Sequence, residues 1–350
     1  MAIPSSLIRS TITTKFLALW KERLRPTTFL ATWFPDTTPT ATRYVSIEVQ
    51  RGKEKIAVDV LRNAEGNHNK FEKSTQKDFD PTYFDENFTV DSLRMYDRLI
   101  GSGSVDAGVV TAILNEGTEK MQMLADKIER RYELQRAQAL QTGIVTATST
   151  ENIDFQRKAS MILAYNAAHN FADNTVSISS FLGTWGSLMR SVGKVGTGTF
   201  DLLMGSSAYQ AMIANTKFQA EADIRRIALT DIVSPVKNTE GADYMGMFSA
   251  GTCNYRIWVY DQYYEDASGT LQPYIDPKKI IILPPNPAFM MAYAGVPQLI
   301  DEDNPVVRTG KFIYYSYTDE RRRSRVYGVQ SAGLPILLEV DKLFTATVLA

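Results

Sequence analysis

The longest coherent pattern in the sequence is VDAGVVTAILNEGTEKMQMLADKIERRYELQRAQALQTG, residues 105 to 143. Asp106 falls in the first turn, where a carboxylate suits the helix dipole, and Gly143 stands just past the end, where glycine favours a helix stop. We therefore predict one helix over residues 105 to 142, about 55 Å long at 1.5 Å per residue. Its apolar residues recur at spacings of three and four, as on one helix face: Val110, Ile113, Gly117, Met121, Leu124, Ile128 and Tyr132.

A helix of this length far exceeds the average globular helix of about 11 to 12 residues. It could be a mechanical spine or a coiled-coil arm. A coiled coil would need a sustained heptad repeat, and the apolar stripe of this segment does not show one. The pattern therefore favours a spine that packs along its length on a sheet.

Strands are predicted before this helix. Residues 45 to 49 alternate between apolar and polar side chains, which indicates a half-buried strand, and residues 55 to 61 (KIAVDVL) indicate another. Residues 62 to 80 are polar, charged and poor in core residues, so we expect them to project from the body. The segment PTYFDENFTVD, residues 81 to 91, then brings back three aromatic side chains that we expect to pack: Tyr83, Phe84 and Phe88.

The C-terminal half mixes helices and strands without strict alternation. LQTGIVTATSTENIDFQRKA, residues 140 to 159, indicates a hairpin; residues 179 to 233 indicate helix, strand and helix; and residues 253 to 286 are rich in strand-forming residues. The chain ends on the apolar stretch LFTATVLA, which we expect to dock into a sheet. These patterns predict an α+β fold with a central sheet.

Composition limits the partners of the chain. The 38 Lys and Arg residues nearly balance the 39 Asp and Glu residues, so no overall positive field attracts a polyanion, and any nucleic-acid contact must be local or weak. The single cysteine, Cys253, fits a protein made in a reducing cytoplasm. No signal peptide is visible, and no apolar stretch approaches the roughly 20 residues that span a bilayer, so we expect a soluble protein without a membrane partner.

Catalytic and metal-binding motifs are not found in the sequence. His68 and His169 have no Cys or His neighbours at metal-ligand spacing, and no G-x-S-x-G motif occurs, so we expect no metal, no cofactor and no enzyme activity. The run GKVGTGT, residues 193 to 199, could suggest a phosphate loop. However, Lys194 precedes the later glycines and a strand follows, which is the reverse of the Walker A order, so we predict a connecting turn.

Two kinds of charged cluster are candidate contact sites. The acidic runs at residues 85 to 87 and 301 to 303 could meet a neighbouring subunit or bulk solvent. In the segment TDERRRSRVYG, residues 318 to 328, a strand would place Arg321, Arg323 and Arg325 on one face. Such a face could pair with carboxylates within the chain or across a subunit interface, could be solvated, or could meet phosphates loosely.

The predicted features would offer surfaces to neighbouring molecules. They are an N-terminal arm (1–40), a projecting polar loop, a very long helix, a hairpin and a docked C-terminal stretch. In this combination the sequence resembles the lambda-type tailed bacteriophage major capsid proteins, the major capsid protein E family, which have the Hong Kong 97-like fold. The motifs that carry the resemblance are RPTTFLATWFPDTTPTATRYVSIEV, KIAVDVLRN through DFDPTYFDENFTVD, the long helix, LQTGIVTATSTENIDFQRK, TFDLLMGSSAYQAM, YRIWVYDQYYEDASGTLQPYIDPKKIIILP, AYAGVPQLID and VQSAGLPILLEVDKLFTATV.

The resemblance implies a division of the chain into five parts. These are an N-terminal arm (1–40), an extended β-hairpin loop (41–90), a peripheral domain with the spine helix and a β-hairpin (91–180), an axial domain (181–310), and C-terminal strands that return to the peripheral domain (311–350).

The resemblance also implies a function. Pentamers and hexamers of the subunit would close an icosahedral shell around double-stranded DNA in the virion, after assembly in the host cytoplasm. The expected partners are copies of the chain itself, a separate scaffolding protein, a portal, packaged DNA held non-specifically, and possibly a decoration protein. Two alternatives stay open: an encapsulin-like compartment shell, and a nucleotide-binding α/β enzyme that uses residues 193 to 199.

Candidate contacts between subunits follow from the same considerations. Lysines lie in the loop where some relatives form covalent crosslinks, but no partner asparagine can be inferred, and we expect no crosslink. The candidate residues are Lys70, Phe71, Lys73, Lys77 and Phe79 in the loop, Asp301 and Asp303 in the second acidic run, and Arg321, Arg323 and Arg325.

Overall fold

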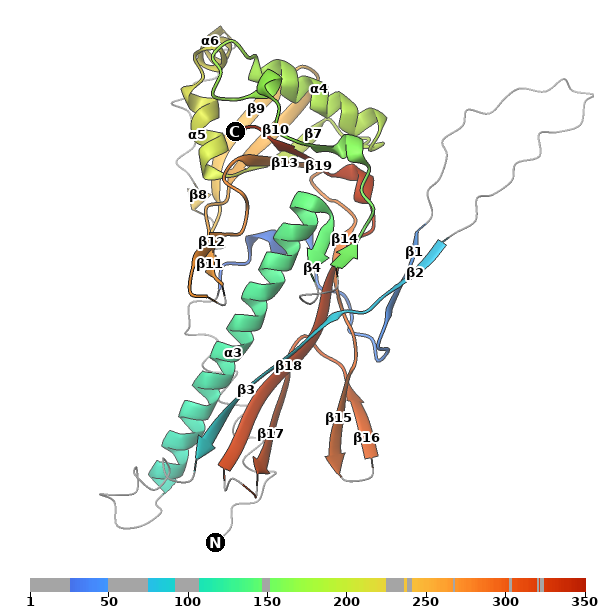
Figure 1. Ribbon diagram of the computed structural model, residues 1–350, viewed down its shortest axis with the longest axis vertical. Coiled ribbons are helices and arrows are strands. Elements are labelled where there is room, and N and C mark those ends of the chain that lie inside the picture. The colour runs from blue at the N-terminus through green and yellow to red at the C-terminus, as the bar shows by residue number, and fades with distance from the viewer. Residues whose placement is uncertain are drawn as a thin grey trace, which may run out of the picture.

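Two sheets and one long helix organise the chain (Figure 1). The computed structural model describes residues 26–49, 75–91, 107–146, 152–224, 236–237, 241–266, 268–301, 304–319, 321 and 324–350. A seven-stranded sheet with its helices forms the upper body in Figure 1, and the long helix with a four-stranded sheet forms the lower body. This mixture of helices and strands confirms the predicted α+β class.

The long helix is α3 (Ala107–Thr142), which is 36 residues long and corresponds to the helix predicted over 105 to 142. Among its described side chains, Met121, Ile128 and Tyr132 are buried, each at most 2% exposed, and they form one face. The helix ends at Gly143, whose φ of 75° is left-handed and whose N–H donates to the Ala139 carbonyl at 2.9 Å.

The buried face of α3 packs on a four-stranded antiparallel sheet centred on β18 (Ser324–Leu337). This strand pairs with β14 (Phe289–Tyr293) through its C-terminal half and with β17 (Ile313–Asp319) and β3 (Thr82–Asp91) through the rest. On β3, Phe84 and Phe88 pack under α3 as predicted. The expectation that Tyr83 also packs is wrong: its side chain is 51% exposed, because successive residues of a strand face opposite sides.

The seven-stranded sheet mixes parallel and antiparallel pairs, and its helices cover one face. Within α4, buried residues at three- and four-residue spacing (Ile178, Leu182, Trp185 and Met189) pack on this sheet. The helices are α4 (Ile178–Ser191), α5 (Ser206–Ala214) and α6 (Thr216–Ile224). The strands, in spatial order, are β6 (Ile162–Leu163), β19 (Phe344–Thr347), β13 (Lys279–Leu283), β7 (Thr199–Met204), β10 (Cys253–Val259), β9 (Asp243–Ala250) and β8 (Val236–Lys237).

Several sequence predictions in this body are confirmed. The apolar C-terminal stretch supplies β19, which lies between β6 and β13 rather than at an edge. The run at 193 to 199 connects α4 to β7 as the predicted turn. His169 is 8% exposed and packs against the rings of Phe181 and Trp185, in line with a structural histidine.

The other face of the seven-stranded sheet meets the segment that follows Pro26. The short 3-10 helix η1 (Phe29–Trp33) buries its aromatic residues, and the Phe29 ring lies 5.3 Å from Trp258 and 5.6 Å from Tyr260. The described end of the predicted arm therefore belongs to the core of the body.

Four two-stranded pairs complete the described strands. One of them, β4 with β5, is the hairpin predicted after the long helix. Another, β1 with β2, is an antiparallel pair within residues 41–90, where the resemblance implied an extended β-hairpin loop. The pairs are β1 (Val45–Val49) with β2 (Thr75–Phe79), β4 (Ile144–Thr146) with β5 (Asn152–Asp154), β11 (Tyr263–Glu265) with β12 (Leu271–Pro273), and β15 (Val296–Asp301) with β16 (Asn304–Arg308).

Three further short 3-10 helices lie between these elements, at η2 (Ala159–Met161), η3 (Ala167–His169) and η4 (Val340–Lys342). The predicted strand at 55 to 61 and most of the polar loop lie outside the described residues.

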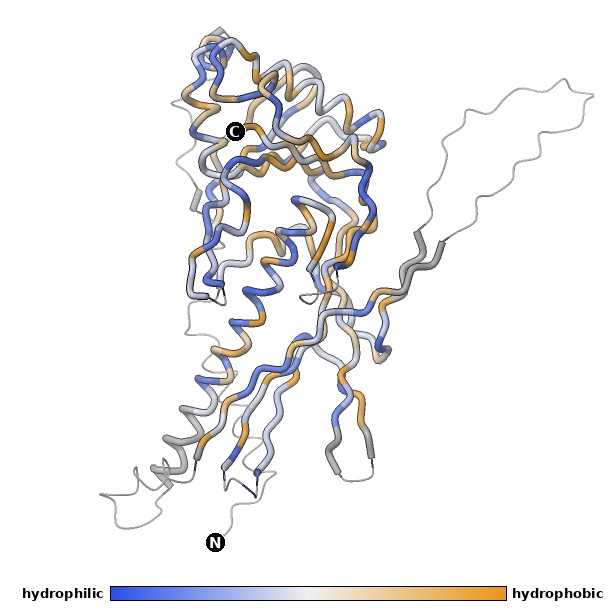
Figure 2. The backbone as a smooth tube through the Cα atoms, in the orientation of Figure 1, coloured by the Kyte–Doolittle hydropathy of each residue, from blue (hydrophilic) through white to orange (hydrophobic). Residues whose placement is uncertain are grey.

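The two sheets draw strands from several of the predicted parts of the chain. Strand β14 belongs to the sheet under α3, although residue 289 falls in the predicted axial domain, and β19 belongs to the seven-stranded sheet, although residue 344 falls in the returning C-terminal strands. Figure 2 shows apolar residues concentrated on strands of the upper body, while polar and apolar residues alternate along α3. Within the described ranges, no helix is both long and apolar enough to cross a membrane.

Candidate assembly surfaces and the charge cluster beneath α3

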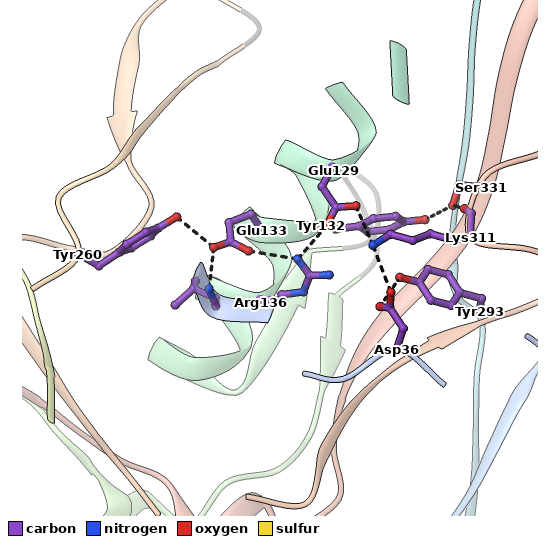
Figure 3. A network of polar contacts seen from close by, with 10 residues as sticks. Asp36, Glu129, Tyr132, Glu133, Arg136, Tyr260, Tyr293, Lys311 and Ser331 are labelled. Carbon is purple, nitrogen blue, oxygen red and sulfur yellow. Dashed lines mark hydrogen bonds and ion pairs between the residues drawn. The ribbon is translucent and has the colours of Figure 1, made fainter. Parts of the chain in front are cut away.

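A cluster of charged side chains lies where α3 meets the rest of the chain (Figure 3). Arg136 is fully buried, and its Nη1 donates to Glu133 Oε2 at 3.1 Å and to Glu129 Oε1 at 3.2 Å. Helical spacing permits both pairs, because residues three and seven positions apart lie on the same face. Burial opposes the charge on Arg136, but the two carboxylates outweigh it and raise the pKa of the guanidinium.

Glu133 extends the cluster toward the segment that follows Pro26. Its Oε1 accepts hydrogen bonds from the Leu30 backbone N–H at 2.9 Å and from the Tyr260 hydroxyl at 3.0 Å. Burial raises the pKa of the Glu133 carboxyl, and the Arg136 charge partly counteracts this effect. The cluster therefore joins α3 to η1 and to the end of β10.

Lys311 extends the cluster in the other direction. Its ammonium lies 3.1 Å from Glu129 Oε2 and 3.3 Å from Asp36 Oδ2, and Asp36 also accepts a hydrogen bond from Tyr293 at 2.7 Å. Ser331 connects α3 to the same region, because its hydroxyl pairs with the Tyr132 hydroxyl at 2.5 Å and donates to the Lys311 carbonyl. Segments far apart in the sequence thus converge on one side of α3.

A second joint fixes the end of α3 to the seven-stranded sheet. The guanidinium of Arg157 donates to three backbone carbonyls, those of Leu140, Met161 and Leu343, at 2.9–3.2 Å. Burial lowers the pKa of Arg157 to about 10. Its aliphatic stem covers Gly143, where an added Cβ would lie 2.4 Å from the Arg157 Cδ.

The predicted strand face of arginines is wrong for Arg321. Asp319 and Ser324 pair across β17 and β18, so the chain turns between them, and the Arg321 N–H caps this turn by donating to Asp319 Oδ1 at 3.0 Å. Of the three arginines, Arg325 alone is a described strand residue. It lies 5.6 Å from the Tyr327 ring and donates to Ser316. Arg323 lies outside the described residues.

The remaining contact candidates lie in different environments. Phe79 is half-buried and packs on Phe155 with ring centroids 5.5 Å apart, which gives it a packing role inside the subunit. Lys77 and Asp301 lie on β2 and β15. Lys70, Phe71, Lys73 and Asp303 lie outside the described residues.

The first acidic run takes part in contacts within the subunit. On the sheet face opposite α3, Asp85 accepts hydrogen bonds from the hydroxyls of Tyr315 and Tyr83, at 2.6 and 3.3 Å, and from the Gln330 amide at 3.0 Å. Its neighbour Glu86 faces α3 and pairs with Lys127 at 2.8 Å. Within the described ranges, no group of three or more His, Cys, Asp or Glu residues could hold a metal ion.

The sequence prediction missed the cluster around Arg136. A signal was present, because Glu129, Glu133 and Arg136 share the helix face of Ile128 and Tyr132. Charged residues at i and i+7 within an apolar stripe indicate a buried pair. Their partners, however, come from distant parts of the chain, and no local spacing identifies these.

The architecture defines a class of protein, the Hong Kong 97-like shell subunit. Its features here are a spine helix that lies along one sheet, charged side chains that join this helix to a second sheet, and hairpins at the flanks. The sequence model of the family described as phage major capsid protein E matches residues 19–348. The chain belongs to this family, and it is a phage major capsid protein that assembles in many copies into the icosahedral shell of the virion. A structural rather than enzymatic role follows from this membership.

One solved structure supports the same fold, and two others show lower similarity. A protein described as the capsid protein of an Escherichia coli CFT073 prophage is 15% identical, with a TM-score of 0.64 and 99% of each chain covered. The capsid protein of a native GTA particle is 10% identical, with a TM-score of 0.48 and 94% and 92% of this chain and that chain covered. The SrpI encapsulin of Synechococcus elongatus PCC 7942 is 13% identical, with a TM-score of 0.40 and 94% and 89% covered. No curated protein matches the chain.

Proposed function

We propose that this subunit forms pentamers and hexamers that close around double-stranded DNA, with no catalytic activity of its own. The family match over residues 19–348 carries this proposal. The proposed partners are a separate scaffolding protein, a portal, the packaged DNA, and possibly a decoration protein, with assembly in the host cytoplasm. The proposed domain division into arm, loop, peripheral domain, axial domain and returning strands belongs to the same proposal.

The arrangement of the described residues supports a mechanical role. Many modest contacts between copies suffice for a closed shell, because each added subunit makes several contacts at high effective concentration. Within the subunit, two charge-based joints fix α3 to η1 and to the seven-stranded sheet, so force applied to one body reaches the other through paired side chains.

The test is to express the chain with the neighbouring scaffold and portal genes and to image the product by electron microscopy. Closed icosahedral particles with pentameric and hexameric units are expected. A chain that stays monomeric at high concentration with these partners present would contradict the proposal.

The contents of particles from infected cells separate the two kinds of shell. Double-stranded DNA is expected inside. A protein cargo without DNA would instead favour the compartment-shell alternative.

A further inference from the structure

Charge is distributed unequally around α3. Among its described side chains, from 117 to 142, three of the four acidic residues are buried: Asp126, Glu129 and Glu133. Arg136 is buried with them. The other four basic residues of this stretch all reach solvent: Lys120, Lys127, Arg130 and Arg131.

The four outward basic residues share one side of the helix. At about 100° per residue they fall, together with Glu119, within roughly 120° of arc. The distance along the axis from Lys120 to Arg131 is about 16 Å at 1.5 Å per residue. We call this side, made of Lys120, Lys127, Arg130 and Arg131, the basic face of α3.

Contacts within the subunit neutralise this face only in part. Lys127 pairs with Glu86 at 2.8 Å, while its side chain is still 62% exposed. Lys120 lies 5.5 Å from the Phe88 ring, and Arg131 donates to the Thr146 carbonyl. Arg130 is exposed, and within the described part of the chain no hydrogen bond or ion pair is recorded for it.

Exposed cations elsewhere on the described surface have mixed partners. Arg43 and Lys158 pair with carboxylates, at 2.9 and 3.0 Å, whereas Arg190 and Lys217 donate to backbone carbonyls. The basic face of α3 differs from these by gathering four cations on one side of one helix, in a chain whose formal net charge is only -1.

We propose that the basic face of α3 lines the inner surface of the shell and contacts phosphates of the packaged DNA. This inference rests on the proposed function, which places DNA inside the shell. Duplex DNA carries about one negative charge per 1.7 Å of its axis, so a basic face about 16 Å long meets several phosphates without reading any base. The opposite face of the sheet presents the exposed Asp85 carboxylate and suits a polyanion less well.

The strength of this contact suits DNA that must leave the head. Four cations that also make contacts within the subunit, such as Lys127 with Glu86, give a salt-sensitive attraction rather than a tight site. Each subunit contributes weakly. Summed over many subunits, these contacts hold the outer layer of DNA against the inner surface of the shell.

The test compares binding of unassembled wild-type and variant subunits to a 30-base-pair duplex of arbitrary sequence between about 50 and 200 mM salt. The variant is Lys127→Gln/Arg130→Gln, which removes two exposed charges and leaves the buried cluster intact. Its affinity at the lower salt concentration is expected to fall about tenfold, and its salt slope to decrease by about two, because each phosphate contact contributes roughly 0.9 to the slope. The matched control, Arg43→Gln/Lys158→Gln, removes two charges elsewhere and should leave both quantities unchanged.

Equal effects of the two double variants, or no binding by the wild-type subunit, would overturn the inference. A loss of scaffold-dependent assembly in Lys127→Gln/Arg130→Gln with unchanged duplex binding would also overturn it and would assign the face to an acidic protein partner. Electron microscopy of wild-type shells keeps the two proposals distinguishable. If the wild-type subunit forms normal shells and Lys127→Gln/Arg130→Gln binds the duplex as well as the wild type does, only the inference about the basic face is refuted. If the wild-type subunit fails to form shells, the proposed function is refuted.

Discussion

Arg136 makes both of its ion pairs with residues of its own helix, and it is completely enclosed. A buried ion pair is costly to form, because both charges lose their hydration, but it is far more costly to break from one side. Removing the guanidinium would leave the fully buried Glu133 without its ion-pair partner, while Glu129 would keep its ion pair with Lys311. The value of Arg136 to the fold therefore lies mainly in compensating the Glu133 carboxylate.

We expect Arg136→Ala to lower the free energy of unfolding of the unassembled subunit by about 3 to 5 kcal/mol, as for other broken buried pairs. Urea denaturation followed by tryptophan fluorescence measures the change. The control is Arg130→Ala on the exposed side of the same helix, which should change stability by less than about 0.5 kcal/mol. Similar losses in the two variants would show that Arg136 is not a structural joint.

Buried tyrosines make the subunit sensitive to alkali. Burial raises the pKa of Tyr132 and Tyr260 above the usual value of 10. The folded state therefore holds these protons at pH values where the unfolded chain has released them. Stability from this source is fully present below pH 10 and decreases as the pH rises above it.

We expect the melting temperature to fall steeply between pH 10 and 12, with tyrosinate absorbance appearing together with unfolding. In Tyr132→Phe the fall should be shallower, because one raised pKa is gone, although the lost hydrogen bond to Ser331 lowers stability at neutral pH. Full tyrosinate absorbance in a still folded subunit would contradict this account.

At the scale of elements, the sequence predicts helices and strands that are set by local pattern better than those that are set by pairing with distant strands. The bounds of α3, the β4–β5 hairpin and the apolar strand β19 follow from periodicity and turn residues within each segment. The strand β2 and the turn at Arg321 could not be found in this way. The polar residues of β2 form a strand because they pair with β1, and the chain turns at Arg321 because β17 pairs with β18. Both pairings depend on the fold of the whole chain.

The candidate site was less predictable than the elements. The Arg136 cluster receives donors and acceptors from Leu30, Asp36, Tyr260 and Lys311, which no spacing rule brings together. The basic face of α3 becomes visible only once burial separates its acids from its bases. Sequence gives the charges of a helix, and tertiary packing decides which of them stay outside.

The junction after α3 depends on one glycine. Gly143 has a left-handed φ of 75°, and an added Cβ would also collide with the Arg157 side chain. We expect Gly143→Ala to destabilise the subunit by about 1 to 3 kcal/mol, the usual range for backbone strain of this kind. Thermal unfolding measures it, with Gly196→Ala as the control, because Gly196 has open space around its Cβ position. An unchanged melting temperature in Gly143→Ala would show that the junction tolerates a side chain.

The turn between β17 and β18 separates two roles among the arginines. We expect Arg321→Gln/Arg323→Gln to weaken shell assembly, measured by light scattering, while the unassembled subunit keeps its melting temperature. Arg325→Gln should instead lower the melting temperature, because Arg325 packs on Tyr327 within the subunit. Weaker DNA retention with normal assembly in the double variant would favour a phosphate contact at the turn.

At the scale of the whole molecule, the sequence between β1 and β2 is polar, charged and poor in residues that could join a core. We expect deletion of residues 63 to 74, joined by a short Gly-Ser linker, to leave a folded subunit that no longer forms closed shells. Circular dichroism checks the fold, and electron microscopy checks the particles. Normal particles from this variant would show that the loop makes no essential contact between subunits.

The position of β19 has a consequence for synthesis. This strand lies between β6 and β13, although it is translated after every other strand of the seven-stranded sheet. The sheet therefore stays open, without one of its inner strands, until residues 344–347 have been synthesised. Fragments that terminate before β19 cannot complete the sheet. They therefore cannot fold into subunits that would enter a growing shell and disrupt it.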